Sequence, residues 1–416
     1  MELCLFLHWL FLSSIALSLG NGSKFYVHPN DDPSQCPNDI PCWDINEYAN
    51  NAFMNDSVYY FLPGVHNLNR SINIEWGSNL TFQGEGVMRE GPHTTVMESP
   101  VVIQCIGYVT VTFGNCNNLS LSNLTIKNCG YNVAGSENGY PGLVINVSSA
   151  NLSYMSLQES QWIALWLIDA SDITVYHSSF YRNGYSIDIL YNYDLPSQSL
   201  LEVNECNFTE SFTGLFLTLY QNVDVNIRIT AVHLYNSSYG IDLFSTARLY
   251  DLQMNRLVSS GCGTVFYLRQ NSTSVTDSPS INITDSVISQ SSLRAFLLNS
   301  GNINISNCTF SNNRDSALGL VNAFVTFFGD NYFINNIGRK GGGINFIVAS
   351  YIYLSPDAYL SFINNSADVT GGAINIDQPA VYYSHVSVAL CFFQFLGTRN
   401  KTYRRSGYIR GCLFSR

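Results

Sequence analysis

The chain has 416 residues, a net charge of −11 and an isoelectric point of about 5.0. Only 12% of its residues are charged, against about 25% in an average soluble protein, so Ser, Thr and Asn must solvate much of the surface. This acidic balance disfavours a nucleic acid or an anionic membrane as partner. The length suggests two or three globular domains, but an internal repeat overrides that expectation because stacked coils share one core.

The N-terminus carries an apolar run over residues 3–19 that ends in Ser18-Leu-Gly20. Such a run is short for a spanning helix, and the small residues stand where a signal peptidase cleaves. Glu2 departs from the pattern, since a basic residue is usual there. We interpret residues 1–20 as a signal peptide, with a membrane anchor as the alternative. The mature chain is then expected to be secreted or displayed on the cell surface, without membrane insertion.

Asn-x-Ser/Thr sequons are a second sign of export. The chain holds about sixteen of them, and each is an acceptor for N-glycosylation in a secreted protein. Asn-rich turns beside Thr-rich strands also generate sequons by chance. The candidate glycosylation sites are Asn55, Asn79, Asn118, Asn123, Asn146, Asn151, Asn207, Asn236, Asn271, Asn282, Asn304, Asn307 and Asn364.

Cysteine usage points to the same compartment. Cys36 and Cys42 enclose a short loop, and we expect a disulfide between them because small loops are stapled in this way in oxidising compartments. Cys206 and Cys308 precede an apolar anchor at the same offset and are expected to be buried core thiols. There is no Cys-x-x-Cys and the seven His are scattered, so no metal or cofactor site is expected.

Residues 21–86 are expected to form an N-terminal cap and the first strands. Between Trp43 and Phe53, helical spacing places six apolar residues near one face: Trp43, Ile45, Tyr48, Ala49, Ala52 and Phe53. A helix here would cover the open apolar end of the first coil. Residues 58–62 then form a strand that a Pro-Gly turn ends.

From residue 87 to residue 390 one unit recurs, in which a short apolar strand leads to an Asn-containing turn and a second apolar strand. Its clearest copies centre on Phe310, Phe333 and Phe362, and weaker copies on Leu157, Phe180, Phe208, Leu234, Leu257 and Ile288. These anchors recur every roughly 22 to 31 residues, which is the length of one solenoid coil. We therefore predict an all-β fold, a right-handed single-stranded parallel β-helix with an N-terminal helical cap.

Residues 391–416 differ from the coils. They begin another apolar strand that is not completed, and they then turn basic while the rest of the chain is acidic. We expect an incomplete coil and a basic tail here, arising from a chain cut short, with a genuine flexible tail as the alternative.

The repeat motifs also point to known families. Phe333 with Gly342-Gly-Ile344, and Phe362 with Gly371-Gly-Ala-Ile374, resemble the Phe-x-x-Asn and Gly-Gly-x-Ile repeat of polymorphic outer-membrane proteins. The segment 41–86 resembles the capping region of pectin-lyase-like β-helix proteins. The likeness implies a secreted or cell-surface protein that carries a right-handed β-helix. Gly342 and Gly372 are expected where no Cβ fits.

A carbohydrate-active enzyme, either a polysaccharide lyase or a glycoside hydrolase that cleaves acidic glycans, is one functional alternative. Glycosidases need two carboxylates about 5–5.5 Å or 6.5–9.5 Å apart, and only Asp188 and Asp242 stand outward at equivalent coil positions. Phe216 is expected at the matching place between them, with Asn345 and Asn375 on later coils. Two coils correspond to about 10 Å, and cations are few. Asp188 and Asp242 are therefore interpreted as ordinary solvated residues, and catalysis by this pair stays the alternative.

A glycan-binding surface is the other alternative. Aromatic side chains gather in the middle coils, and their faces stack on sugars: Trp162, Trp166, Tyr185, Tyr191, Tyr193, Tyr220, Tyr235, Tyr239 and Tyr267. Tyr191 and Tyr193 flank an Asp-Leu-Pro turn and are the best candidates for exposure. The sequence favours a structural, adhesive or recognition role without catalysis, and an extracellular glycan or cell-surface protein as partner.

Overall fold

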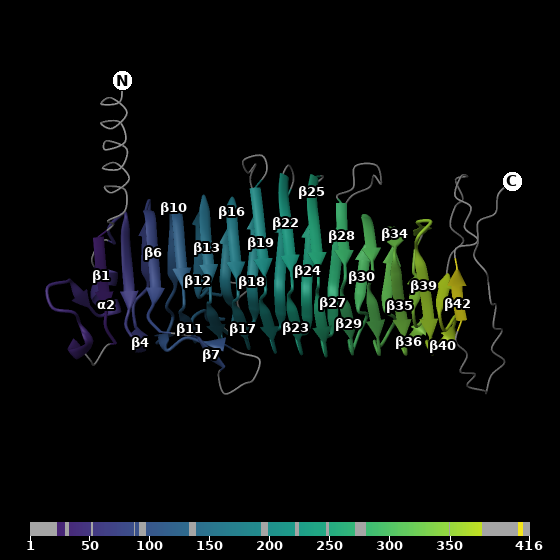
Figure 1. Ribbon diagram of the computed structural model, residues 1–416, viewed down its shortest axis with the longest axis horizontal. Helices are drawn as coiled ribbons and strands as arrows, with labels where there is room; N and C mark the ends of the chain where they lie inside the picture. Colours follow the sequence, from purple (N-terminus) through teal and green to yellow (C-terminus); the bar gives the residue numbers. More distant parts are fainter. Residues whose placement is uncertain are drawn as a thin grey trace, which may run out of the picture.

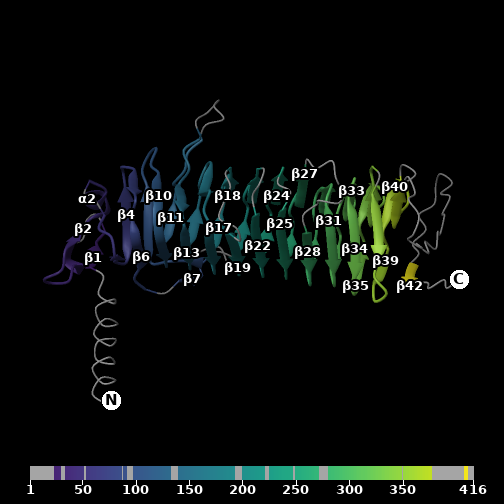
Figure 2. The same cartoon turned by 90° about the horizontal axis from the view of Figure 1, so that it is seen from above.

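The computed structural model describes residues 23–29, 33–50, 53–86, 88–90, 97–132, 139–192, 199–220, 224–246, 249–270, 280–348, 350–376 and 407–410. It is an elongated stack of parallel strands with the N-terminal strands at one end and the last coils at the other (Figures 1 and 2). Each turn contributes one strand to each of three sheets, which we call A, B and C. The chain visits them in the order B, C, A. The predicted signal peptide lies outside the described residues.

Sheet A runs the length of the stack, and every strand pairs in parallel with its neighbours. Its strands, in spatial order, are β2 (Cys42–Trp43), β1 (Ser23–Val27), β3 (Ser57–Phe61), β6 (Ser78–Gly84), the second half of β10 (Val111–Ser122), β13 (Ser149–Ser153), β16 (Asp172–Tyr176), β19 (Ser199–Asn204), β22 (Asp224–Thr230), β25 (Leu249–Asn255), β28 (Ser280–Thr284), β31 (Asn302–Ser306), β34 (Phe324–Phe328) and β38 (Tyr351–Leu354).

Sheet C is joined to sheet A through β10, whose first half lies in sheet C. The other strands of sheet C are β5 (Ile72–Glu75), β12 (Leu143–Val147), β15 (Ile163–Ile168), β18 (Tyr185–Tyr191), β21 (Thr213–Leu219), β24 (Tyr239–Ser245), β27 (Thr264–Gln270), β30 (Phe296–Asn299), β33 (Leu318–Val321), β37 (Ile344–Phe346) and β41 (Ile374–Ile376).

Sheet B has short strands: β4 (Gly64–Leu68), β9 (Val101–Cys105), β11 (Thr125–Lys127), β14 (Ser156–Gln158), β17 (Ser179–Tyr181), β20 (Asn207–Thr209), β23 (His233–Tyr235), β26 (Val258–Ser260), β29 (Val287–Ser289), β32 (Thr309–Ser311), β35 (Asp330–Ile334), β39 (Tyr359–Ile363) and β42 (Gly407–Arg410). The last of these pairs antiparallel with β39. Two small pairs complete the strands: β7 (Arg89–Glu90) with β8 (Met97–Glu98), and β36 (Ile337–Lys340) with β40 (Ser366–Thr370).

The all-β parallel β-helix predicted from the sequence is confirmed. Parallel strands joined by crossovers of this kind are almost always right-handed. One apolar core cluster extends from Phe25 to Phe362, so the residues on either side of position 86 share one interior. Burying each large core side chain stabilises the fold by roughly 1.5–3 kcal/mol.

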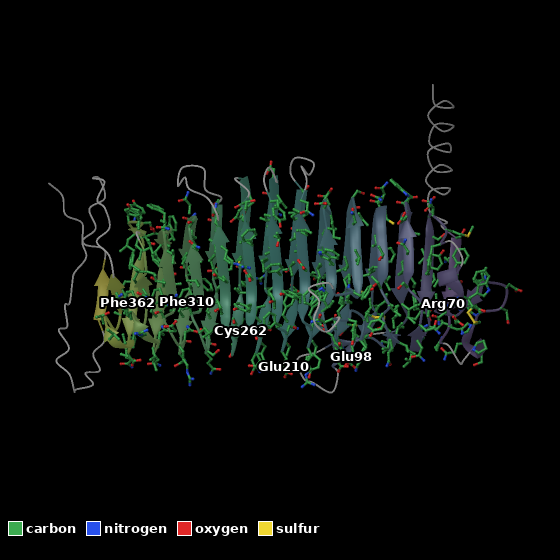
Figure 3. All side chains as sticks on the ribbon, turned by 180° about the vertical axis from the view of Figure 1, so that it is seen from behind. Arg70, Glu98, Glu210, Cys262, Phe310 and Phe362 are labelled. Atoms are coloured by element: carbon green, nitrogen blue, oxygen red, sulfur yellow. A yellow bond between two sulfur atoms is a disulfide. The ribbon has the colours of Figure 1, made fainter. Side chains whose placement is uncertain are left out.

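The predicted anchors stack in sheet B. The Phe180 and Phe208 rings lie 4.8 Å apart and nearly parallel, and Phe333 stacks in the same way on Phe310 and Phe362. Figure 3 labels Phe310 and Phe362 near the C-terminal end. The anchor predicted at Leu257 is wrong. Ser259 pairs with both Leu234 and Ile288, and Leu257 fills the preceding corner, because size alone does not distinguish these two inward positions.

The two residues of the repeated Asn-Asn dipeptide have different structural roles. The first Asn of each pair adopts a positive φ: Asn312 (55°), Asn335 (54°) and Asn364 (51°). The second Asn points inward and forms a ladder, in which Asn313 donates to Asn336 at 2.9 Å and Asn336 donates to Asn365 at 2.9 Å. Positive φ is tolerated by Asn, and the ladder satisfies amides that burial would otherwise leave unpaired.

Both predicted glycine positions are confirmed as sites without room for a side chain. A Cβ on Gly342 would lie 2.6 Å from the carbonyl oxygen of Asn336, and one on Gly372 would lie 2.8 Å from that of Asn365. These distances are shorter than van der Waals contact, so the chain folds back this closely on the corner of its own turn only because glycine has no Cβ.

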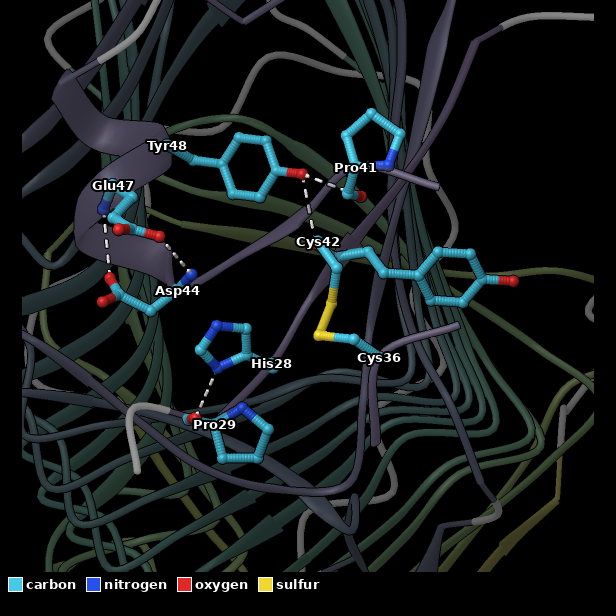
Figure 4. Close-up of a disulfide and its surroundings, with 9 residues drawn as sticks. His28, Pro29, Cys36, Pro41, Cys42, Asp44, Glu47 and Tyr48 are labelled. Atoms are coloured by element: carbon cyan, nitrogen blue, oxygen red, sulfur yellow. Dashed lines mark hydrogen bonds between the residues drawn. A yellow bond between two sulfur atoms is a disulfide. The ribbon is translucent and has the colours of Figure 1, made fainter. Parts of the chain in front are cut away.

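The N-terminal cap contains a short helix, α2 (Ile45–Asn50), after the 3-10 turn η1 (Pro33–Gln35). Asp44 caps it, because its carboxylate accepts from the backbone N–H group of Asn46. Its carboxylate also accepts from the Glu47 N–H, and Glu47 accepts from the Asp44 N–H in return (Figure 4). This reciprocal arrangement is a capping box. Ile45 and Tyr48 are buried at the end of the core, as the helical spacing predicts.

Trp43 was expected on the same helical face, and this is wrong. It lies in β2 and its surface is 41% exposed, because the capping box starts the helix after Asp44. The predicted disulfide between Cys36 and Cys42 is present beside the helix (Figure 4). A second disulfide, which the sequence did not indicate, joins Cys105 to Cys129 on successive turns. Cys206 and Cys308 are buried and free, as expected.

Candidate functional site

The middle of sheet C carries the chemistry-bearing side chains. We call the outward side chains of β15, β18, β21, β24 and β27 the sheet C face. Parallel register places equivalent residues of successive turns one above the other, about 4.8 Å apart. One column of this face therefore contains, in order, Trp166, Asp188, Phe216, Asp242 and Tyr267.

Asp188 lies between two aromatic neighbours in this column, Trp166 and Phe216. It is half-buried, and the described residues give it no hydrogen bond or ion pair. Burial without a partner disfavours the charged carboxylate. It raises the pKa of Asp188 from 3.8 to about 7. A carboxyl group that holds its proton near neutral pH can act as a proton donor.

Asp242, two turns further along, has a different environment. Its side chain is only 12% exposed, and Arg269 donates to it through Nε at 3.1 Å and Nη2 at 2.9 Å. The Nη2 atom also lies 2.9 Å from the second carboxylate oxygen. Burial raises the pKa of Asp242, and Arg269 opposes that rise. The charge-assisted bonds hold the ionised form in place.

Arg269 is itself enclosed by aromatic rings. Its guanidinium carbon lies 5.1 Å from the centre of the Tyr267 ring, 5.7 Å from that of Phe244 and 6.0 Å from that of Phe216. Such distances allow cation–π attraction. The three rings fix the arginine in the orientation that meets Asp242. Phe216 therefore separates the two carboxylates and also supports the cation that pairs with one of them.

A second row of aromatic residues follows the corner between sheets B and C. We call Trp162, Tyr185, Phe212 and Tyr239 the aromatic ridge. Neighbouring ring centres along it are 5.4, 6.0 and 5.8 Å apart. Each residue belongs to a successive turn, so the ridge runs parallel to the axis of the solenoid, beside the column of Asp188 and Asp242.

Tyr185 connects the ridge to the column. Its ring centre lies 5.6 Å from that of Phe216. Burial, and then the charges of Asp188 and Asp242, raise the pKa of its hydroxyl, while Arg269 lowers it. The influence of all three charges indicates that the aromatic ridge and the carboxylates form one continuous site.

Other aromatic residues picked out in the sequence lie elsewhere. Tyr191 was expected at the surface and this is wrong, because it is fully buried. It follows Ile187 and Ile189 at a spacing of two along β18, which points it inward. Tyr220 and Tyr235 are exposed but belong to the corner after β21 and to β23 of sheet B. Tyr193 lies outside the described residues.

The candidate glycosylation sites are distributed unevenly over the three sheets. Five stand on the outer side of sheet A: Asn79, Asn118, Asn151, Asn282 and Asn304. Asn207 starts β20 of sheet B and Asn146 lies on β12 of sheet C. The corners hold Asn55, Asn123, Asn236, Asn307 and Asn364, and Asn271 lies outside the described residues. In the part of the chain that the structure describes, β15, β18, β21, β24 and β27 carry none.

Three residues of the site were not singled out by the sequence: Phe212, Phe244 and the pairing partner Arg269. The sequence indicated only that cations are few and gave Arg269 no role. Arg269 stands one turn after Asp242 and two positions further along its strand. A signal was available, because the separation of 27 residues in sequence is one repeat length, and a repeat length brings two residues together in a solenoid.

The described residues contain no group of three or more His, Cys, Asp or Glu that could hold a metal ion. Nor do they include a helix of sufficient length and apolar character to span a bilayer. The site therefore consists of two carboxylates, one arginine and a set of aromatic rings.

No family model matches the chain, and no curated protein matches it. Several solved structures resemble it in part. DFA-IIIase from Arthrobacter chlorophenolicus A6 aligns with 12% identity and a TM-score of 0.42, covering 87% of this chain and 100% of that one. The GH87 alpha-1,3-glucanase from Streptomyces thermodiastaticus strain HF3-3 aligns with 14% identity and a TM-score of 0.33, covering 77% of this chain and 67% of that one.

ORF18 of Geobacillus virus E2 gives 13% identity and a TM-score of 0.35, covering 74% of this chain. The chain spans 54% of the length of that viral protein. Likenesses at this level carry no argument about the activity of the present chain, which has to be inferred from its own residues.

Proposed function

We propose that this protein is a carbohydrate-active enzyme that binds a glycan on the sheet C face and hydrolyses it, with Asp188 as general acid and Asp242 as general base. The observation that carries the proposal is the contrast between two carboxyl groups on one aromatic surface. Burial without a partner keeps Asp188 protonated to about pH 7, while Arg269 binds Asp242 as a carboxylate. Environments that separate two acids in this way are typical of acid–base pairs.

The chemical step follows from these two states. Asp188 gives its proton to the glycosidic oxygen as the bond from that oxygen to the anomeric carbon breaks. A water molecule attacks this carbon from the opposite side and passes a proton to the Asp242 carboxylate. Two turns separate the residues by about 10 Å, close to the roughly 6.5–9.5 Å of inverting glycosidases. The product is therefore expected with inverted anomeric configuration.

The aromatic residues supply the substrate contacts. A sugar ring that stacks on Phe216 lies between the two carboxyl groups, because Phe216 separates them in the column. Neighbouring sugars can stack on Trp166, Tyr267 and the aromatic ridge, since the apolar face of a pyranose packs well on an aromatic ring.

The test is an assay of a glycan panel for new reducing ends, with NMR of the first product to establish its anomeric configuration. We expect Asp188→Asn and Asp242→Asn each to lower turnover by about 10²- to 10⁴-fold. Asp224→Asn, an exposed carboxylate on β22 of sheet A, is the matched control and should leave turnover unchanged. Full turnover in both site variants, or no product from any glycan, contradicts the proposal.

Recognition of a glycan without cleavage is the second candidate, in keeping with a structural, adhesive or recognition role. Its support is that Asp242 is fully engaged by Arg269, which makes it a weaker base. Binding of a glycan without any release of reducing ends would favour this candidate over hydrolysis.

We further propose that the protein works outside the cell, secreted or on the cell surface, as a glycosylated protein. The disulfides Cys36–Cys42 and Cys105–Cys129 support this, because disulfides persist in oxidising compartments. Mass spectrometry of the protein released by secreting cells tests it through the cleaved N-terminus and the occupied sequons.

A further inference from the structure

We infer that the glycan bound by the sheet C face is a neutral polymer that lies along the axis of the solenoid over about five turns. This inference rests on the glycan-binding part of the proposed function and names the substrate class. It depends on two independent observations: the pairing of the cations around the site, and the direction in which the aromatic rings follow one another.

Four cations on and beside the site are engaged by carboxylates. On the sheet C face, Arg269 is held by Asp242. Along the corner beside the aromatic ridge and further along sheet C, the described residues form three more ion pairs, with N–O distances of 3.6, 2.8 and 3.2 Å: Lys127–Glu159, Arg182–Glu210 and Arg294–Asp315.

A polyuronate carries one negative charge on every sugar. Binding such a chain here would place those charges beside the Asp242 carboxylate, with no cation among these pairs left to meet them. Like charges on a poorly solvated surface repel strongly, and an acid such as Asp188 that is protonated near neutral pH donates equally well to a hydroxyl. The site therefore matches sugars that present hydroxyl groups and apolar ring faces rather than carboxylates.

The direction of the polymer follows from the aromatic ridge. Its four rings belong to four successive turns, and the ring centres are at most 6.0 Å apart. At the N-terminal end the ridge stops at Trp162, because the backbone of Gly139 packs against this ring, where a Cβ would lie only 2.4 Å from it. The pitch of about 4.8 Å per turn is close to the length of one sugar unit, so an extended chain parallel to the axis meets a new ring at each sugar.

The strands of the sheet C face are free of candidate glycosylation sites. Their described parts carry no sequon, whereas five stand on the outer side of sheet A. One sequon, Asn236, lies on the corner that the aromatic ridge follows, just before Tyr239. N-glycans on sheet A would therefore leave the column of Asp188 and Asp242 open for a ligand.

The test is calorimetric binding of two oligosaccharide series, neutral and uronate, each from two to eight sugars. We use the Asp188→Asn variant so that the ligand is not cleaved. We expect affinity for the neutral series to rise with length up to about five sugars and then level off, and the uronate series to bind at least tenfold more weakly. Preferred binding of uronates, or an affinity that is independent of length, overturns the inference.

A pair of tryptophan variants tests the direction. Trp162→Ala removes the first ring of the ridge, four turns from Tyr267 and on the turn before Asp188. It should weaken binding of the longest neutral oligosaccharides by about three- to tenfold and leave the shortest ones unaffected. Trp76→Ala removes a tryptophan that is 73% exposed at another corner of the solenoid. It should leave the binding of both long and short oligosaccharides unchanged. Equal effects of Trp162→Ala on short and long ligands contradict an axial path.

The outcomes for the two proposals are separable. Binding of neutral oligosaccharides without turnover by the wild-type protein removes hydrolysis and keeps this inference. Turnover of a uronate polymer keeps hydrolysis and removes this inference. Absence of binding to any member of both series removes both.

Discussion

Sheets A and C share one interior but present different outer surfaces. Both alternate inward apolar with outward side chains, and both stack each residue on its equivalent in the next turn. On the middle strands of sheet A most outward positions are polar, and some of them hydrogen-bond in ladders, as Asn118 does to Asn79 and Asn304 to Asn282. On sheet C the same positions hold aromatic rings around Asp188 and Asp242. The core determines the fold, and the outer columns are free to carry a function.

The ion pairs on the two sheets also differ in how far they are exposed to solvent. Glu202 and Arg228 pair on sheet A at 3.2 Å with side chains 33% and 52% exposed. Asp242 and Arg269 pair on sheet C at 2.9 Å with side chains 12% and 36% exposed. Exposed pairs contribute little to stability, whereas breaking a buried pair leaves a charge that water cannot solvate.

The largest expected effect comes from removing the arginine of each pair. We expect Arg269→Met to lower the free energy of unfolding by about 2–3 kcal/mol, less than the cost for a fully buried pair because Arg269 is partly solvated. Arg228→Met, the matched change on sheet A, should cost about 0–1 kcal/mol. Urea unfolding of the two variants measures the difference. Equal losses in the free energy of unfolding would show that the ion pair on sheet C contributes no more to stability than the exposed pair on sheet A.

The next effect depends on pH. Asp188 loses its proton near pH 4 in the unfolded chain but only at about pH 7 in the folded protein, so the folded state binds more protons in between. Stability should therefore fall as the pH rises from about 4 to 7. Asp188→Asn removes this loss and should be more stable than the wild type at pH 8 by about 1–3 kcal/mol, allowing for partial solvation.

Urea unfolding at pH 4 and pH 8 checks this result. The gap between Asp188→Asn and the wild type should be present at pH 8 and nearly absent at pH 4. Asp224→Asn, whose side chain is exposed on sheet A, should show no such change. A gap of the same size at both pH values would mean that the carboxyl group is solvated in the folded protein.

The smallest effect belongs to the polar ladder of sheet A. Asn304→Ala removes the hydrogen bond of 2.8 Å to Asn282 at a partly exposed position, and should cost about 0.5–1 kcal/mol. It should leave glycan binding unchanged, because sheet A is not part of the site. Calorimetry with the best neutral oligosaccharide tests this second point, and weaker binding would place sheet A in the ligand path.

Much of the fold could be predicted because a solenoid repeats its constraints. Phe310, Phe333 and Phe362 recur with the same neighbours, so one register satisfies all three. The errors arose where a single turn departs from the pattern. Ser259 replaces a large anchor and shifts the apparent repeat to Leu257, and Asp44 begins the helix one residue after Trp43. The hydrogen bonds of the Asp44 cap decided the second position, and a small residue at an anchor position decided the first. Apolar spacing indicates neither.

The candidate site could be predicted only in part. The alternation of apolar residues placed Asp188 and Asp242 outward on one surface, with Phe216 between them, and their register confirms that arrangement. The same alternation, applied one step further, would have placed Tyr191 inside. The repeat length brings Arg269 close to Asp242, but the bidentate geometry of that pair and the isolation of Asp188 could not be predicted, because both depend on how side chains fold across neighbouring turns.

A solenoid can alter the separation of two residues only in whole turns. Excising residues 207–232 would bring His233 to the position of Asn207, since these two are in register, and would remove the turn that holds Phe216. Asp188 and Asp242 would then become direct neighbours at about 4.8 Å, near the roughly 5–5.5 Å spacing of retaining glycosidases. In this architecture the loss of a single coil is enough to change the stereochemical course open to a pair of acids.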